Sequence, residues 1–444
     1  MKRDILFLTT VGMVIWSAFF FTAGGAMAGQ YDPLLKVLIK KGILTEREAI
    51  EIQREAMADE ERQRSKLTKE IREETTTKDL KGLKFKMLAY LDYSIGKKAA
   101  PLGGQKSYNE FTVKRGYLRV YKTITPWLAG HLTYDVHQDE AGDWKARLKY
   151  LYALFRPGNL GILTEMKAEV GLGHTPWLDF EEHINPYRCQ GTMAIERAGI
   201  FNSADLGISL HGNWGGELED AVVNTGNSHY AGRYGSWHIG VYNGSGYHSK
   251  ENNSNKVVEG RLTIRPLPES LPGLQLSYFG LYGKANEKSD INKGYPDYQV
   301  HMGFLSYEHP RFIFTAQYFV TEGNKDGKWL KRNGKALWTE NYSFFVNVRP
   351  PVYPMSSWLD RKLNLFFRYD HVDRDKNNQV AKDAHYNLYI AGGTIEVSHG
   401  NYILADYEFT DFGNDFGDRY SSAPSLANKP GNQQKFQIVY QLKF

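Results

Sequence analysis

The chain has 444 residues, a formal net charge of +5, an aromatic content of 14% and a single cysteine, Cys189. One cysteine excludes an internal disulfide framework, and the absence of a Cys-x-x-Cys-His motif excludes an attached c-type haem. The modest net charge argues against a dedicated nucleic-acid-binding protein. No other cofactor is indicated by the composition.

The N-terminus has the pattern of a secretory signal. Lys2 and Arg3 precede an apolar run from Ile5 to Phe21, and small residues follow it up to Ala28. This pattern predicts a signal peptide at 1–28 with cleavage after Ala28. A retained anchor helix is the alternative, because the apolar run is long for a signal. No other stretch approaches a helical membrane span, so a membrane-resident chain would have to cross as closed strands.

Residues 29–82 are expected to form a helical, coiled-coil-like segment. Asp32-Pro33 has the form of a helix N-cap followed by a first-turn proline, and this short helix should end at Gly42. Thr45 to Glu48 forms a capping box for a second, longer helix that extends to about Arg72. Polar residues interrupt both columns of a heptad template there, so any coiled coil is weak. Two interpretations stay open: a periplasmic helix that trimerises or contacts the cell wall, or a solvated helix.

From Lys84 onward the apolar residues recur at every second position, which is the period of a half-buried β-strand. The pattern predicts an all-β fold with sixteen strands in residues 83–444. The first begins at Lys84, and the others are expected at 111–124, 127–137, 145–156, 163–174, 204–213, 234–243, 256–265, 273–283, 298–308, 311–321, 336–348, 360–372, 384–398, 400–411 and 434–444.

Short, turn-like connections alternate with longer polar loops along this region. Such alternation is typical of a transmembrane antiparallel β-barrel with turns at one end and loops at the other. The connection 215–233 breaks the rule, because it is long where a short turn is expected. It contains either a hidden strand pair, giving eighteen strands, or an insertion. A barrel of sixteen to eighteen strands would enclose an aqueous lumen.

The last eleven residues place Phe436, Ile438, Tyr440, Leu442 and Phe444 on one face of a strand. A strand of a soluble sandwich is the alternative reading of this alternation. An ending on an apolar face with a final aromatic residue resembles the closing strand of bacterial outer-membrane barrels. That resemblance implies that Tyr440, Leu442 and Phe444 act as the assembly signal, read by the barrel assembly machinery.

The longest loop, 175–203, is dense in charge. It contains the candidate residues Asp179, Glu181, Glu182, His183, Arg188, Glu196 and Arg197. It is the third long loop, and in general porins the third long loop folds into the barrel and forms the constriction. A metal site at His183 is the alternative, but no second ligand pair has tetrahedral spacing, so we expect no metal.

If the apolar face of each strand faces lipid, a set of basic residues faces the lumen. The candidate pore-lining residues are Arg115, Arg119, Arg147, Lys149, Lys167, Arg261, Arg265 and Arg368. The facing of Arg115 and Arg119 is ambiguous, because the strand pattern slips register between Phe111 and Arg119. Rings of arginine favour anions. Alternatively, these side chains pair with inward acids and only hold the wall.

Three segments are similar to the phosphate-selective porin O and P family: Phe111 to Arg119, Val241-Tyr242-Asn243-Gly244, and Arg261 to Pro266. The resemblance implies a sixteen-stranded homotrimeric anion channel in the outer membrane of a Gram-negative bacterium, surrounded by outer-membrane lipid.

The leading hypothesis is therefore a porin for passive diffusion of small hydrophilic solutes, with a preference for anions such as phosphate. The alternative is a sheath that encloses a periplasmic multihaem cytochrome in an electron conduit. We expect no enzymatic activity, because no Gly-x-Ser-x-Gly or His-Glu-x-x-His motif occurs. The helical segment 29–82 would lie in the periplasm.

Overall fold

The computed structural model describes residues 33–45, 48–49, 52, 80–99, 104–139, 141–352, 358–359, 362–416 and 431–444. The chain divides into two compact units, Met1–Lys81 and Gly82–Phe444. The expected signal peptide at 1–28 and most of the expected coiled-coil-like segment lie outside the described residues. Within the part of the chain that is described, no helix is long and apolar enough to cross a membrane.

The described part of the first unit contains the helix α2 (Pro33–Lys40), which ends before Gly42, as expected from the sequence. Gly42 has a φ of 70°, the left-handed conformation typical of a residue that ends a helix. The expected capping box is present, because the Glu48 carboxylate accepts a hydrogen bond from the Thr45 backbone N–H at 2.8 Å. In return, the Glu48 N–H donates to Thr45 Oγ1 at 3.3 Å.

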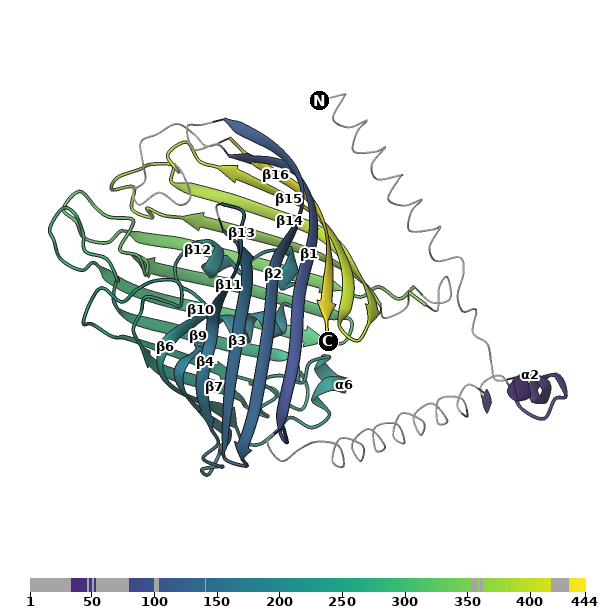
Figure 1. Cartoon of the computed structure of the whole chain (residues 1–444). Helices are drawn as coiled ribbons and strands as arrows, with labels where there is room; N and C mark the ends of the chain where they lie inside the picture. The colour runs from purple at the N-terminus through teal and green to yellow at the C-terminus, as the bar shows by residue number, and fades with distance from the viewer. Residues whose placement is uncertain are drawn as a thin grey trace, which may run out of the picture. The chain divides into compact units, whose positions relative to one another are not determined.

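The second unit is a closed antiparallel barrel of sixteen strands, each paired with its neighbours in sequence and β1 paired with β16 (Figure 1). The prediction of sixteen strands is confirmed. The strands are β1 (Leu83–Ala99), β2 (Gln105–Thr125), β3 (Leu128–Gln138), β4 (Trp144–Phe155), β5 (Leu163–His174), β6 (Ala204–Trp214), β7 (Gly235–Tyr242), β8 (Val257–Ile264), β9 (Leu274–Lys284), β10 (Asp297–His309), β11 (Phe312–Glu322), β12 (Trp338–Val348), β13 (Leu363–Asp373), β14 (His385–Ser398), β15 (Asn401–Phe412) and β16 (Gln433–Lys443).

Side chains alternate between the two faces of each strand, and the outward ones are apolar. On β13, Leu365 and Phe367 are exposed on the outside, whereas Arg368 and Asp370 are buried on the inside. A wall with an apolar outer face and a polar inner face is the pattern of a transmembrane barrel.

The inside of the barrel is not uniformly polar, which the alternation alone did not predict. The strands from β8 to β16 also direct apolar side chains inward. These buried residues are Val257, Phe279, Leu281, Val300, Met302, Phe304, Phe319, Phe345, Phe366, Leu388, Ile390, Leu404 and Val439. Strands β2 to β5 carry mainly charged residues, histidines and tyrosines on the same inner face. On β8 to β16 the apolar side chains are interspersed with buried polar and charged ones such as Arg368 and Asp370, whereas β2 to β5 are mainly polar inside. We call these the apolar side and the polar side of the lumen.

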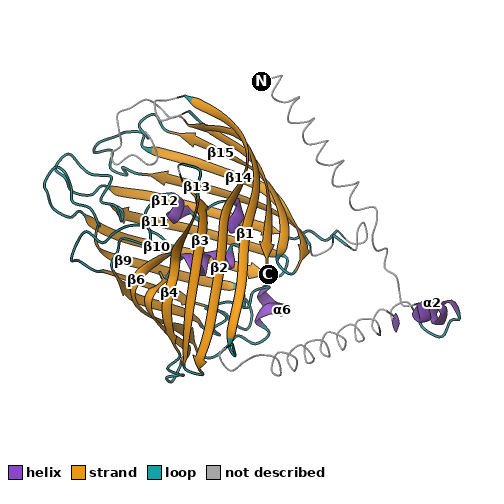
Figure 2. Ribbon diagram, viewed as in Figure 1, coloured by secondary structure: helices purple, strands orange, loops and turns teal. Residues whose placement is uncertain are grey.

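The long connection between β6 and β7 is an insertion, so the eighteen-strand alternative is wrong. It contains the short helix α6 (Ala221–Thr225) and an isolated bridge between Glu217 and Gly232. Figure 2 shows α6 at the end of the barrel where the C-terminus lies. The insertion therefore belongs to the end with the short turns.

The barrel closes between β1 and β16, from the pair Leu88–Lys443 to the pair Lys97–Gln434. Phe444 extends this seam, because its N–H donates to Met87 O at 3.2 Å and its carbonyl accepts from Met87 N–H at 2.8 Å. Its side chain is 72% exposed on the outside.

Candidate constriction site

The loop 175–203 between β5 and β6 folds into the barrel and packs against its apolar side. It forms α4 (Leu178–Ile184), a single 3-10 turn η1 (Arg188–Gln190) and α5 (Ala194–Arg197). Trp177, which is fully buried, lies with its ring centroid 5.7 Å from Phe279 and 5.1 Å from Phe304 on the inner wall. Figure 2 shows the helical turns of this loop behind β2 and β3, inside the barrel. Burial of these apolar side chains is what holds the loop in the lumen.

Ion pairs hold the middle and the end of the same loop. Arg188 donates to Glu182 at 2.7 Å and to Glu196 at 2.9 Å, so it links α4 to α5. Arg197 pairs with Glu408 of β15, which also lies 2.9 Å from Lys435 of β16. Four of the seven charged residues predicted for this loop therefore fix the loop itself, since they pair within it or with the wall.

Further hydrogen bonds attach η1 to the strands next to the closing seam. Lys114 of β2 donates to the Cys189 carbonyl at 2.9 Å, and Gln437 of β16 donates to the Gln190 carbonyl at 2.9 Å. Tyr402 of β15 donates to the Pro186 carbonyl at 3.1 Å. Burial raises the pKa of the Cys189 thiol to about 12, so this cysteine is inert and structural.

The polar side of the lumen carries a basic cluster on β2, β3 and β4. Arg115 and Arg147 share one carboxylate, that of Asp135, and each lies 2.8 Å from its Oδ2. Asp135 is fully buried, whereas the side chains of Arg115 and Arg147 are 20% and 31% exposed. Two guanidinium groups with one carboxylate leave a net positive charge at this point of the wall.

Lys149 adds a second positive charge beside this pair. Its Nζ lies 4.6 Å from the ring centroid of Tyr117, 5.3 Å from that of Tyr150 and 5.9 Å from that of Tyr247. It donates to the Tyr117 hydroxyl at 3.2 Å, and no carboxylate of the described residues lies within 4 Å of it. Ring faces stabilise the ammonium without neutralising it.

Two β-bulges place Lys114 and Lys149 on the inner face. Between β1 and β2, Tyr90 pairs with Arg115 and Leu91 with Val113, so Lys114 is an extra residue. Between β3 and β4, Thr133 pairs with Tyr150 and Tyr134 with Leu148, so Lys149 is an extra residue. The first bulge accounts for the register slip seen in the sequence, and both direct additional charge into the lumen.

The other predicted pore-lining residues differ in their surroundings. Arg119 lies on the inner face of β2 with its guanidinium 5.6 Å from the Tyr117 ring, and Lys167 pairs with His211 in register on β5 and β6. Arg261, Arg265 and Arg368 also point inward but are only 2%, 4% and 1% exposed. Arg368 is paired with Asp370 at 2.6 Å. These three arginines therefore support the wall and the loop.

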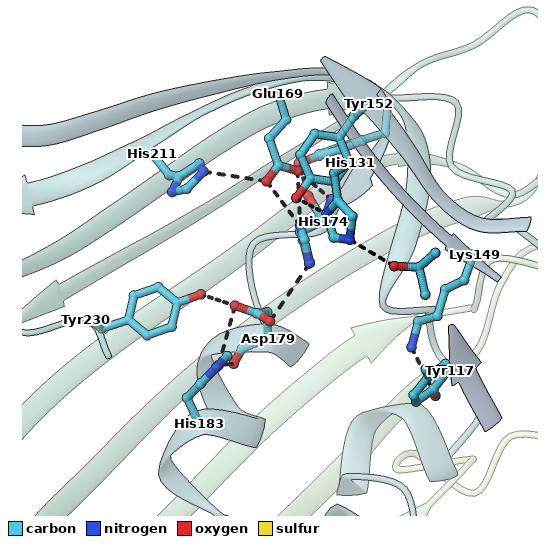
Figure 3. A network of polar contacts seen from close by, with 12 residues as sticks. Tyr117, His131, Lys149, Tyr152, Glu169, His174, Asp179, His183, His211 and Tyr230 are labelled. Carbon is cyan, nitrogen blue, oxygen red and sulfur yellow. Dashed lines mark hydrogen bonds and ion pairs between the residues drawn. The ribbon is translucent and has the colours of Figure 1, made fainter. Parts of the chain in front are cut away.

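A histidine–carboxylate network joins the polar wall to α4 (Figure 3). His174, at the end of β5, lies 3.1 Å from Glu169 on the same strand and 3.9 Å from Asp179 on α4. His211 of β6 lies 3.7 Å from Glu169 on its other side. His174 is thus the contact between the wall and the constriction loop.

Asp179 and His183 form the next link of the network. His183 Nδ1 lies 3.5 Å from Asp179 Oδ2, one helical turn away. Burial disfavours the charged form of His183, but the charge of Asp179 and the hydrogen bonds to Asp179 together outweigh this and raise the pKa of His183 to about 9. Burial alone would raise the pKa of Asp179, whereas His183 and His174 hold it well below its usual range. Both residues are therefore charged at neutral pH.

Glu181 points away from this network, toward the apolar side. Its carboxylate accepts a hydrogen bond from Trp177 Nε1 at 2.7 Å. Burial raises the pKa of Glu181 to about 7. It therefore serves packing and is not in a position to contact solute.

The alternation and loop patterns of the sequence did not indicate His174, His211 or Asp135 as members of this site. His174 ends its strand directly before the loop, which is a signal that could have drawn attention to it. The described residues contain no group of three or more His, Cys, Asp or Glu side chains able to hold a metal ion.

No protein-family model and no curated protein matches this chain. Solved structures do match its fold. An anion-selective porin from Comamonas acidovorans is 11% identical with a TM-score of 0.52, over 82% of this chain and 100% of that one. OprB of Pseudomonas putida is 10% identical with a TM-score of 0.52, over 84% and 97%. OmpF of Salmonella typhi is 13% identical with a TM-score of 0.50, over 81% and 97%. At these identities the likeness is one of fold.

Proposed function

We propose that the chain is an outer-membrane porin of a Gram-negative bacterium, a water-filled channel for passive diffusion of small hydrophilic solutes that prefers anions. The observation that carries the proposal is a closed sixteen-strand barrel in which an inward-folded loop faces a wall of basic residues.

The outer face supports the location in a membrane. Large apolar side chains such as Ile208, Ile239 and Leu365 are about half exposed there, which water would disfavour and lipid would not. Exposed aromatic residues lie toward both ends of the strands, for example Tyr282 near the long loops and Trp127 near the short turns. This distribution fits an apolar band between two aromatic girdles.

The charge of the polar wall supports the preference for anions. Arg115, Arg119, Arg147, Lys149 and Lys167 lie on this wall with the carboxylates of Asp135 and Glu169, and the opposing α4 adds Asp179 and Glu182. Burial, and after it the positive charges of Arg147 and Arg115, lower the pKa of His248, in the loop after β7, to about 3. The anion-selective porin from Comamonas acidovorans has the same fold. Phosphate is a candidate solute because guanidinium groups bind it well.

The decisive experiment is a planar-bilayer recording of the purified protein in a salt gradient. We expect single-channel conductance and a reversal potential on the anion side. Replacing Arg147 and Lys149 together with Gln removes two positive charges at little change in volume, so the reversal potential should shift toward cations. The shift should shrink as salt rises, because screening acts over about 8 Å at physiological salt.

Lys250→Gln, in an exposed loop position, is the matched control and should leave the reversal potential unchanged. A protein that does not conduct would overturn the pore, and a cation-selective wild type would overturn the anion preference.

The expected alternative, a sheath around a multihaem cytochrome, has less support. The loop 175–203 occupies part of the lumen that a cytochrome would have to enter. We further propose a homotrimer whose segment 29–82 lies in the periplasm, to be tested by chemical crosslinking in intact outer membranes and by protease access from the periplasmic side.

A further inference from the structure

The connection 215–234 between β6 and β7 extends across the end of the barrel. Arg265, directly after β8, donates to the Gly232 carbonyl at 3.2 Å. At its far side, Gly226 ends α6 so close to the β10–β11 turn that an added Cβ would lie 3.2 Å from Pro310 Cα. The connection therefore extends over the barrel mouth from β6 to β8 as far as the β10–β11 turn. We call residues 215–234 the clamp.

The clamp contacts α4 from the short-turn end of the barrel, although α4 belongs to a loop from the opposite end. The Tyr230 hydroxyl donates to Asp179 Oδ2 at 2.5 Å, as Figure 3 shows. Asn227 Nδ2 donates to the His183 carbonyl at 3.0 Å and to Glu308 of β10 at 2.7 Å.

Ring contacts accompany these hydrogen bonds. The rings of His229 and His183 lie 3.9 Å apart, and Tyr230 meets Phe180 edge to face at 5.1 Å. Arg261 of β8 fixes the junction, because its guanidinium lies 4.0 Å from the Phe180 ring and 5.0 Å from the Tyr230 ring. The clamp and β8 thus contact α4 at Asp179, Phe180 and His183.

We propose that the clamp is the second half of the constriction: it holds α4 from the short-turn end, and Asn227, His229 and Tyr230 position Asp179 and His183 in the lumen. The effect on permeation rests on the proposed function as a pore. The contact itself does not, so the two can fail separately.

The histidine pair gives the clamp a distinctive pH dependence. His183 is faced by Asp179 and Glu182 of α4, by His229 and Tyr230 of the clamp, and by Glu308 of β10. His229 is faced by His183 and Asp179, and by the positive charges of Lys167 on β5 and Lys443 on β16. Burial and then the charge of His183 lower the pKa of His229 to about 4.

The two histidines act in opposite directions. The raised pKa of His183 contributes stability that is complete below 6.5 and is lost as pH rises through about 9. The lowered pKa of His229 contributes stability that is complete above 6.5 and is lost as pH falls through about 4. The clamp should therefore hold α4 best near pH 6.5.

The first test releases the clamp in the full-length protein. A variant with Asn227→Ala, His229→Ala and Tyr230→Phe should show larger single-channel conductance and stronger open-channel noise than the wild type. Val223→Ser, at a 72% exposed position of α6, is the matched control and should behave as the wild type. Unchanged conductance and noise in the triple variant would overturn the proposal.

The second test separates positioning from mere packing. His229→Phe keeps a ring against His183 but cannot take up a proton. It should abolish the rise in open-channel noise at acid pH and retain the rise above pH 9, whereas the wild type shows both. If the open-channel noise of His229→Phe still rises at acid pH, the role of His229 is contradicted.

The third test does not depend on conduction. In a Cys189→Ser background, His183→Cys with His229→Cys should be joined by a short bis-maleimide in folded, heat-modifiable protein, whereas His183→Cys with Val223→Cys should not. Crosslinking without any conductance in the parent protein would uphold the clamp and refute the pore. Failure of the first pair to crosslink would refute the clamp.

Discussion

Lys114 and Lys149 show how one residue added to a strand changes the chemistry of the lumen. Each lies in a bulge, where the extra residue joins its neighbours on the inner face and interrupts the alternation. Lys114 then holds the loop through the Cys189 carbonyl, whereas Lys149 remains among tyrosine rings. In a regular strand, by contrast, one of any two consecutive side chains would point outward, into lipid.

Asp135 determines how much of the basic cluster is neutralised, so Asp135→Asn should strengthen the preference for anions. The substitution keeps the shape and removes one negative charge, and the reversal potential should move further toward the anion side. Loss of the charge-assisted contacts to Arg115 and Arg147 should cost about 1.5–3 kcal/mol of barrel stability. Asp290→Asn, at an exposed loop position, is the control. A move toward cations would contradict the assignment.

At the scale of elements, the constriction loop depends on the barrel for its structure. The helix α4 has seven residues and no side-chain cap, so it is too short to be stable alone. Trp177, Phe180 and Ile184 bury its apolar face against the inner wall. The same dependence explains why the wall from β8 to β16 is apolar inside.

Glu181, buried at the centre of this packing, should make the stability of the loop depend on pH. Its folded pKa of about 7 lies above the usual 4.5, so its contribution is complete below 4.5 and is lost as pH rises through 7. Glu181→Gln should remove this loss, which is about 3 kcal/mol at most. Unfolding temperatures at pH 4.5 and pH 8 should therefore differ less in the variant than in the wild type.

Glu110→Gln, at an exposed position of β2, is the matched control and should keep the wild-type difference. An equal pH dependence in Glu181→Gln and the wild type would show that the Glu181 carboxyl does not change its ionisation on folding.

The sequence predicted the strands well but not the contacts of the inward-folded loop, for physical reasons. Alternation is a local signal, so most strands were located to within a few residues, with β13 at 360–372 against Leu363–Asp373 as a typical case. The exception is β2, predicted at 111–124 and found at Gln105–Thr125. The loop 175–203 was identified by its length and charge. The roles of the residues in this loop were not predicted, because Arg197 pairs with Glu408, and Asp179 with Tyr230, only after the barrel closes. The alternation of residues shows whether a side chain lies on the inner or the outer face only where no β-bulge interrupts the strand.

At the scale of the whole molecule, different sets of strands line different sides of the lumen. Strands β8 to β16 supply an apolar inner surface that binds the loop, and β2 to β5 supply the charged surface that faces it. The clamp approaches from the opposite end. Two connections from opposite ends of the barrel thus meet at α4, and both belong to the second unit, Gly82–Phe444.

Removing residues 31–81 should therefore leave a folded barrel. Gly82 must be kept, because its carbonyl accepts a hydrogen bond from Thr123 N–H at 3.0 Å at the start of β1. Heat-modifiable gel mobility of the truncated protein in outer-membrane fractions measures the result, with the full chain as control. A truncated protein that no longer shows the folded, heat-sensitive band would mean that the barrel requires the first unit.

The closing seam leads to a prediction that separates assembly from stability. Phe444 adds only two backbone hydrogen bonds with Met87 to a β1–β16 seam that already extends from Leu88 to Lys97. Its ring is 72% exposed on the outer face, so its deletion should cost the folded barrel little. The same exposure leaves the ring accessible for the predicted recognition by the assembly machinery, with Tyr440 and Leu442 on the same face of β16.

Deletion of Phe444 should accordingly lower the amount of protein in the outer membrane, while the molecules that assemble melt close to the wild-type temperature. Refolding into detergent without the assembly machinery should proceed with nearly wild-type yield. Phe444→Tyr, which retains the terminal ring and the backbone, is the control and should restore the membrane level. Equal membrane levels with and without Phe444, or a barrel that fails to refold in detergent after the deletion, would mean that the terminal residue acts through the seam itself and not as a signal.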